Sequence, residues 1–176
     1  DITSFPSDNG IYRQIIDGKI IHDVTTGVGA HWADDDLGTN PSKITYGEIN
    51  TTVEIIAIFK GIVEDMPDYV YLNCDSNLQN GWVIRVTWNG FDILRRDAGV
   101  ETFIDFASYL TGGNETRLVV TNLGGNISVD ALGLTDNVPN GDAASLSINM
   151  GGAYTEQSVV GLGLSPNTYC TYFRVV

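Results

Sequence analysis

Residues 82–96 read WVIRVTWNGFDILRR, two runs rich in branched and aromatic residues on either side of an Asn-Gly pair. Such runs favour strands over helices, and Asn89-Gly90 suits the positive φ angles of a two-residue hairpin turn. The alternate residues Trp82, Ile84, Val86 and Trp88 share one strand face, and we expect them in the core or at its rim. The stretch therefore predicts an antiparallel hairpin with one buried face.

The same pattern extends over the rest of the chain. Residues 11–24, IYRQIIDGKIIHDV, predict a second hairpin around Asp17-Gly18, and residues 26–46 predict mainly loop with one short strand. Further strands are expected at 52–63, 69–74, 82–88, 91–96, 102–106, 117–122, 127–134, 144–150, 158–162 and 168–176. Only residues 107–110 suggest a helical turn. This regular spacing predicts a single-domain, all-β antiparallel sandwich of the jelly-roll kind over residues 1–176, with the sandwich strands at 52–176.

Composition argues against two classes of partner. The 176 residues include 9 Lys and Arg against 22 Asp and Glu, a formal net charge of −13 at pH 7. That charge repels phosphate backbones and anionic lipids, so we expect no nucleic-acid partner. Because no apolar run approaches the roughly 20 residues that cross a bilayer, we also expect no membrane insertion.

The first residues, DITSFPSDNG, lack the basic and apolar regions of a signal peptide. We therefore expect a mature form or an excised domain of an extracellular or surface-exposed protein. Three Asn-x-Ser/Thr sequons, at Asn50, Asn114 and Asn126, permit glycosylation. Cys74 and Cys170 fit either one long-range bridge or two isolated thiols in core strands, and the sequence leaves both open.

From Trp82 to Asp130, a strand ends in Asn-Gly, a second strand FDILRR follows, and VETFIDFASYLTGGNETRLVVTNLGGNISVD comes next. This order resembles the galactose-binding-domain-like jelly rolls found in carbohydrate-binding modules and in accessory domains of glycoside hydrolases. The residues that carry the resemblance are Val86, Asn89, Gly90, Ile104, Asp105, Tyr109, Leu110, Gly113, Asn114, Leu118 and Val120.

The resemblance implies a sandwich in which residues 105–110 make a short turn that plugs an open edge, and Gly113-Asn114 reverses the chain into the next strand. It covers less than a third of the chain. Sugar-binding, structural and cell-surface roles all occur on this type of sandwich, so the resemblance assigns no ligand residues.

Strand alternation gives the candidate ligand residues. In DYVYLNC, residues 68–74, Val70, Leu72 and Cys74 share one face, which leaves Tyr69, Tyr71 and Asn73 on the other. Sugar rings pack their C–H faces on aromatic rings while their hydroxyls bind planar polar groups. An outward tyrosine pair beside Asn73 is therefore a candidate platform; alternatively, a covering layer makes both tyrosines part of a second core.

Two further segments supply candidates. Arg85 faces away from the core in its strand. If that strand neighbours residues 69–74 in the sheet, Arg85 would offer a bidentate donor beside Tyr71; alternatively, it is a surface ion-pair partner. Trp32 is the second candidate for ring stacking or, alternatively, an anchor for its loop. The adjacent Asp34, Asp35 and Asp36 supply oxygen ligands for a structural Ca²⁺, or form a solvated loop. No other cofactor is expected.

Catalytic signals are weak: His22 and His31 lack metal-ligand spacing, and the sequence has no nucleophile elbow or phosphate-binding loop. We therefore expect a non-enzymatic, lectin-like carbohydrate-binding module whose partner is a glycan or polysaccharide. The chain would act alone, as a homo-oligomer, or appended to a larger extracellular protein. The alternative is a structural subunit of an extracellular assembly, such as a filament, virion or tail appendage, that self-associates through sheet edges.

Overall fold

The computed structural model describes residues 13–16, 19–22, 42–45, 50–59, 67–87, 89–109, 115–136, 138–157, 159–163 and 169–175. Within these ranges the chain forms strands and turns. No helix among them has the length and apolar character needed to cross a membrane.

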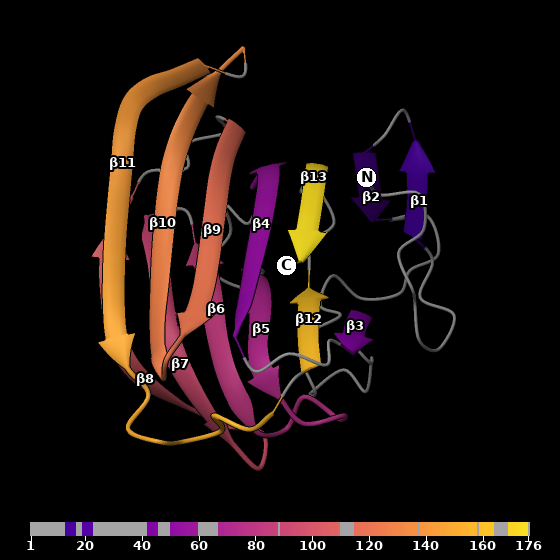
Figure 1. The fold of residues 1–176 in the computed structure, drawn as a ribbon. Helices are drawn as coiled ribbons and strands as arrows, with labels where there is room; N and C mark the ends of the chain where they lie inside the picture. The colour runs from indigo at the N-terminus through magenta and orange to yellow at the C-terminus, as the bar shows by residue number, and fades with distance from the viewer. Residues whose placement is uncertain are drawn as a thin grey trace.

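Two antiparallel sheets form the layers of a sandwich (Figure 1). The first sheet has the order β1-β2-β13-β4-β9-β10-β11, and the second has the order β3-β12-β5-β6-β7-β8. The strands are β1 (Arg13–Ile16), β2 (Lys19–His22), β3 (Ser42–Thr45), β4 (Thr51–Ile58), β5 (Asp68–Cys74), β6 (Gly81–Thr87), β7 (Gly90–Asp97), β8 (Val100–Ser108), β9 (Glu115–Leu123), β10 (Asn126–Thr135), β11 (Val138–Asn149), β12 (Val159–Gly163) and β13 (Tyr169–Val175). The edge strands β8 and β11 lie at the same side of the sandwich and contact each other.

The core lies between the sheets and follows the period-two alternation of the strands. In β4 buried and half-buried residues alternate along the whole strand. The cluster draws side chains from strands of both sheets, and Tyr109 and Met150, which lie outside the strands, belong to it as well. The buried members are Val53, Ile55, Ala57, Phe59, Val70, Leu72, Trp82, Ile84, Val86, Phe91, Ile93, Tyr109, Leu118, Val120, Ile127, Val129, Ala131, Met150 and Val160. Apolar burial on this scale is the main stabilising contribution to the fold.

The all-β jelly-roll sandwich is thus confirmed, and each of the ten strands expected after residue 51 is present with shifted ends. The hairpin at 11–24 is also confirmed: Ile16 pairs with Lys19 across residues 17 and 18. The predicted core face of β6 holds for Trp82, Ile84 and Val86, while Trp88 lies outside the described residues.

Three local expectations are wrong. Of the turn expected at 105–110, residues 105–108 instead continue β8 and pair with β7, while Ala107 packs against the core and Tyr109 is buried in it. The helical turn expected at 107–110 fails for the same reason, since Ala107 and Ser108 still pair as strand residues. The turn between β6 and β7 is displaced by one residue, because Thr87 pairs with Gly90 and the two connecting residues are 88 and 89.

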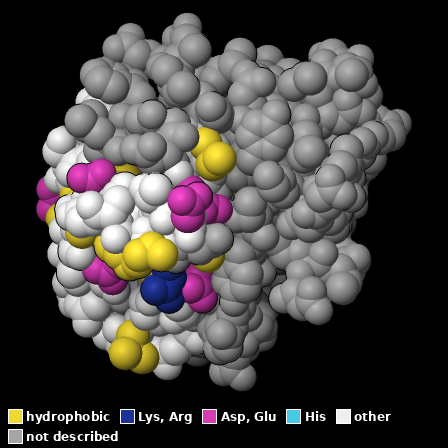
Figure 2. Space-filling model, turned by 90° about the horizontal axis from the view of Figure 1, so that it is seen from above, with side chains coloured by type: hydrophobic (Ala, Val, Ile, Leu, Met, Phe, Trp, Pro, Cys, Tyr) yellow, Lys and Arg dark blue, Asp and Glu magenta, His cyan; other side chains and the backbone are white. Residues whose placement is uncertain are grey.

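The described surface is acidic in character. Figure 2 looks down on the upper end of the sandwich and shows acidic side chains spread over the described part of this face, with basic side chains gathered in one place. Exposed hydrophobic side chains lie among them. Four of the large exposed ones belong to a single strand, β8: Val100, Phe103, Ile104 and Phe106.

We predict that Gly90→Ala destabilises the protein by about 2–4 kcal/mol. A Cβ at Gly90 would lie 2.1 Å from the carbonyl oxygen of Ala107, in a backbone with a φ of 155°. Gly124→Ala is the matched control: its φ is 60° but nothing lies within 4 Å of the added Cβ, so strain alone should cost about 1–2 kcal/mol. Urea unfolding measures both, and equal losses would contradict the steric argument.

Candidate functional site

The second sheet carries a layer of side chains on the face that points away from the core. Cross-strand partners share a face of an antiparallel sheet. The register aligns Tyr69 of β5 with Arg85 of β6, Arg85 with Asp92 of β7, and Asp92 with Phe106 of β8. A second row runs from Tyr71 through Val83 and Leu94 to Phe103, and a third joins Gly81, Arg96 and Glu101. We call these side chains on β5–β8 the outer face.

One end of the outer face is a small second core. Tyr71, Cys74, Leu78, Val83 and Leu94 are buried together, with Tyr69 packed against them. Gly161 of β12 makes this packing possible, because a Cβ there would come within 2.8 Å of Leu78. This end of the outer face is therefore closed. In the remaining part, which we call the open part, the side chains of β8 are exposed, Arg85 is half-buried and Asp92 is buried.

The two candidate tyrosines stack, with ring centroids 6.2 Å apart and planes inclined by 24°. Tyr69 is half-buried, but Tyr71 has a relative exposure of 0%. Arg96 donates a 3.1 Å hydrogen bond to the Tyr71 hydroxyl and lies over its ring, 5.7 Å from the centroid. Burial raises the pKa of Tyr71 well above its usual value, although Arg96 opposes this effect. Of the two alternatives that the sequence leaves open, the second core therefore holds for Tyr71, and the half-buried Tyr69 packs against it.

Asn73 also departs from its expected place. It has a φ of 49°, and the register of β5 against β12 shifts here, so Asn73 interrupts the alternation. Its amide donates a 2.9 Å hydrogen bond to the Gln157 carbonyl, and its Oδ1 accepts one of 2.9 Å from Asn122 in the first sheet. Asn73 therefore joins the two sheets. The same irregularity turns Cys74 toward Tyr71, whereas strict alternation places it with Val70 and Leu72.

Cys74 is a buried free thiol, which decides against a bridge to Cys170. Burial raises the pKa of the thiol from 9.0 to about 12, with the Trp82 main chain lowering it in part. The group is therefore protonated at neutral pH and belongs to the packing.

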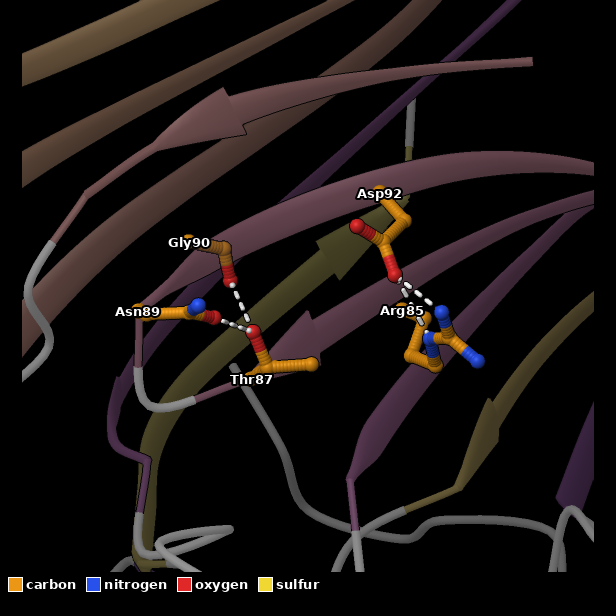
Figure 3. A network of polar contacts seen from close by, with 5 residues as sticks. All are labelled: Arg85, Thr87, Asn89, Gly90 and Asp92. Atoms are coloured by element: carbon orange, nitrogen blue, oxygen red, sulfur yellow. Dashed lines mark hydrogen bonds and ion pairs between the residues drawn. The ribbon is translucent and has the colours of Figure 1, made fainter. Parts of the chain in front are cut away.

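Arg85 and Asp92 form the polar centre of the outer face. Arg85 Nε lies 2.7 Å from Asp92 Oδ2, and one terminal nitrogen of Arg85 contacts the same oxygen. Figure 3 shows the other terminal nitrogen of Arg85, and Oδ1 of Asp92, directed away from this contact. Nearby, the Thr87 hydroxyl lies 2.7 Å from Asn89 Oδ1 and 3.2 Å from the Gly90 carbonyl (Figure 3). The ion pair thus holds two planar polar groups in a fixed orientation.

Phe103 and Phe106 complete the open part of the outer face. Their relative exposures are 59% and 38%, although both belong to a well-defined strand. Neither residue was a candidate in the sequence, because alternation within residues 102–106 does not reveal which face another layer covers. Their alignment with Leu94 and Asp92 sets exposed aromatic rings beside the Arg85–Asp92 pair. Apolar rings beside oriented donors and acceptors suit a ligand that has both apolar faces and hydroxyl groups.

Trp32 and the aspartates Asp34, Asp35 and Asp36 fall outside the described residues. Within the described part of the chain, no group of three or more His, Cys, Asp or Glu side chains is arranged to hold a metal ion. Asp75 organises its own loop by accepting hydrogen bonds from the main-chain nitrogens of Asn77 and Gln79.

No protein-family model matches the sequence, and no curated protein matches it. Solved structures do share the fold. Sheep galectin-11 in complex with glycerol aligns with a TM-score of 0.54 and 12% identity, over 78% of this chain and 98% of that one. The carbohydrate-binding module CBM66 from Bacillus subtilis aligns with a TM-score of 0.52 and 12% identity, over 76% of each chain. The CBM2 module of the evolved Dit of Lactobacillus casei BL23 phage J-1 aligns with a TM-score of 0.50 and 9% identity, over 76% of this chain and 66% of that one.

At these identities the likeness concerns the fold alone. The chain has the lectin-like β-sandwich that galectins and carbohydrate-binding modules share, which confirms the sequence-based resemblance at the level of fold.

We predict that Arg85→Met destabilises the protein by about 1–3 kcal/mol, because the Asp92 side chain is only 9% exposed and would lose its ion-pair partner. The double variant Arg85→Met/Asp92→Asn should regain part of this loss. Arg95→Met is the matched control, since its pair with Asp97 is 41% and 43% exposed and should contribute less than about 1 kcal/mol. Urea unfolding compares the variants; a double variant no more stable than Arg85→Met would refute the buried-charge explanation.

We predict that stability falls as pH rises from about 9 toward 12, and that Cys74→Ala makes this fall shallower. In the folded state the thiol keeps its proton up to about pH 12, whereas the unfolded thiol loses it near 9.0. The unfolded state then binds fewer protons, so each pH unit in this window lowers the free energy of unfolding by up to about 1.4 kcal/mol. Urea unfolding of the wild type and of Cys74→Ala between pH 8 and 10.5 measures the free energy of unfolding against pH. Identical slopes for the two proteins would contradict the assignment to Cys74.

Proposed function

We propose that this chain is a non-catalytic carbohydrate-binding module that binds a glycan or polysaccharide on the open part of its outer face. The observation that carries the proposal is the cross-strand row of Tyr69, Arg85, Asp92 and Phe106, with Phe103 beside it. The shared fold of galectins and carbohydrate-binding modules supports the proposal. Binding would take place outside the cell or at its surface, and requires no chemical step.

The chemistry of the row explains how a sugar would be held. The faces of Phe103 and Phe106 would pack against the C–H side of a pyranose ring, where burial of apolar area contributes most of the affinity. The outward nitrogen of Arg85 would donate to ring hydroxyls, and Oδ1 of Asp92 would accept from them. Because the ion pair fixes both groups before the ligand arrives, little side-chain entropy is lost on binding.

The charge of the chain bears on which glycans fit. A formal net charge of −13 disfavours glycans that carry carboxylates or sulfates, through long-range repulsion. Neutral or amino sugars are therefore the preferred class. A Ca²⁺ ion bound by Asp34, Asp35 and Asp36 stays part of the proposal, and screening with and without calcium addresses it.

A second candidate function rests on the exposure of β8. All nine residues of this edge strand are exposed or half-buried, and four of them are large and hydrophobic. A structural subunit of an extracellular assembly would use such an edge to associate with its neighbours. Light scattering separates the two functions, because the module acts as a monomer whereas the subunit forms large regular particles.

We predict that Phe103→Ala and Phe106→Ala each weaken glycan binding about tenfold, in line with the roughly 1.5 kcal/mol that an aromatic contact contributes. Val100→Ala is the matched control, since Val100 is 68% exposed on the same strand but aligns with Asp97 at the turn. A glycan array identifies the ligand, and titration calorimetry of the variants measures affinity.

Phe103→Ala should alter the unfolding midpoint little, because its side chain is 59% exposed. Phe106→Ala should lower it modestly, because that side chain is 38% exposed and its ring lies against Gly90. Binding that survives both substitutions but is lost with Val100→Ala would place the site elsewhere on β8. Silence of the wild type on neutral and amino glycans, with and without calcium, would contradict the function itself.

A further inference from the structure

Asn-Gly pairs are the points at which a protein chain most readily modifies itself. The main-chain nitrogen of the second residue attacks the side-chain amide of Asn, and Gly hinders that approach least because it has no Cβ. Three such pairs lie within the described residues: Asn80-Gly81, Asn89-Gly90 and Asn140-Gly141. A fourth, Asn9-Gly10, lies outside them. The surroundings of the three described pairs differ in ways that decide which one can react.

The Asn80-Gly81 pair is held firmly in place. The Asn80 amide donates a 2.7 Å hydrogen bond to Asp75 Oδ2, and its Oδ1 accepts one of 2.8 Å from the Ala98 N–H. A Cβ added at Gly81 would lie 2.3 Å from the Cys74 sulfur, so the main chain here is closely packed. Attack on the amide would therefore require both hydrogen bonds to break and the packed main chain to move.

The Asn89-Gly90 pair is restrained in a similar way. The Thr87 hydroxyl donates a 2.7 Å hydrogen bond to Asn89 Oδ1 (Figure 3), and the Tyr109 N–H donates one of 3.0 Å to the Asn89 carbonyl. Gly90 pairs with Thr87 in the sheet, and a Cβ added there would lie 2.1 Å from the carbonyl oxygen of Ala107. The Gly90 peptide thus has no room to turn toward the Asn89 side chain.

The Asn140-Gly141 pair lies in an irregular part of β11, the last strand of its sheet. The register of β11 against β10 shifts between Leu132 and Leu134, and within this described pairing residues 140–142 have no partner in β10. Asn140 and Gly141 are both exposed. No atom of the described residues lies within 4 Å of a Cβ added at Gly141. The Gly141 peptide is therefore outside the ladder and has room to move.

The Asn140 side chain is also oriented for the reaction. Its Oδ1 accepts a 2.9 Å hydrogen bond from the Asp142 N–H, which makes an Asx turn that folds the side chain over the Gly141 peptide. The same hydrogen bond draws electron density away from the amide carbon, Cγ, and so makes it easier to attack. Gly133 leaves space for this arrangement, because a Cβ there would lie 2.6 Å from Asn140 Oδ1.

We propose that Asn140 is a site of spontaneous modification, at which the folded chain converts a side-chain amide into a carboxylate. The Gly141 main-chain nitrogen forms a bond to Asn140 Cγ, while the bond from Cγ to Nδ2 breaks. The proton from the Gly141 nitrogen ends on the departing group, which leaves as ammonia. Water then opens the resulting cyclic imide at either carbonyl and gives aspartate or isoaspartate. The only co-reactant is water, and nothing is oxidised or reduced.

The irregular part of β11 can accommodate either product. Isoaspartate places one more carbon in the main chain, but residues 140–142 have no ladder partners in β10 to lose. Both products add a negative charge beside Asp142. The site belongs to the first sheet, whereas the proposed glycan site belongs to the second, so the two proposals are independent.

The test is peptide mapping by mass spectrometry, after the full chain has been incubated at mildly alkaline pH in water labelled with ¹⁸O. The labelled oxygen marks only those carboxylates that form during the incubation. In the folded protein we expect Asn140 to react at least about tenfold faster than Asn80 and Asn89, since the restrained pairs react only when the structure opens locally. In concentrated urea the three pairs should react at similar rates, because unfolding removes the restraints.

Asn140→Gln is the matched control. It keeps an amide at this position but lengthens the side chain by one methylene, so attack by Gly141 would form a larger and less favoured ring. Incorporation of ¹⁸O at residue 140 should therefore disappear, while Asn80 and Asn89 react as before. Equal rates at the three pairs in the folded protein, or faster reaction at Asn80 or Asn89, would overturn the proposal. So would slower reaction of Asn140 in the folded chain than in urea, because the fold would then protect this pair as well.

Discussion

Apolar contact between the inner faces of the two sheets is the constraint on which the rest of the structure depends. Val53 and Ile55 of β4 share one buried layer with Ile84 of β6 and Ile93 of β7, all with relative exposures of 0%. Side chains alternate along a strand, so committing these residues to the interior fixes the direction of each neighbour. Arg85 and Asp92 point outward because Ile84 and Ile93 point inward. The candidate site is in this sense a consequence of the core.

The outer face is supported as well as exposed. Tyr71 and Leu78 fill one end of it, and the Arg96 guanidinium donates a hydrogen bond to the Tyr71 hydroxyl. A side chain held from below by packed neighbours loses few rotamers when a ligand binds. This arrangement gives Tyr71 a supporting role in any binding by Tyr69, even though a ligand cannot reach Tyr71 itself. Burial of a candidate residue therefore changes its role and does not remove it from the site.

The sequence predicts the strands well because alternation and turn residues are local signals. It predicts the faces of β6 correctly for the same reason. It fails at Asn73, whose left-handed φ depends on partners in Asn122 and Gln157 that lie far away in the sequence. It also fails to single out Phe103 and Phe106. The alternation of side chains along a strand separates its two faces but does not show which face a second layer covers. The resemblance implies a turn at residues 105–110, yet the pairing of β8 with β7 continues to Ser108.

β8 combines two properties that rarely occur together in one strand. Its outer face presents phenylalanine rings next to an ion pair, and its edge lacks Lys and Pro, although a register shift interrupts its pairing with β7 between Ile93 and Leu94. Exposed aromatic rings on an unprotected edge favour aggregation unless something discourages identical copies from pairing. Here the carboxylates of Glu101 and Asp105, within a chain of net charge −13, supply that discouragement. The acidity of the chain therefore opposes self-association at the strand that also carries the exposed rings of the candidate site.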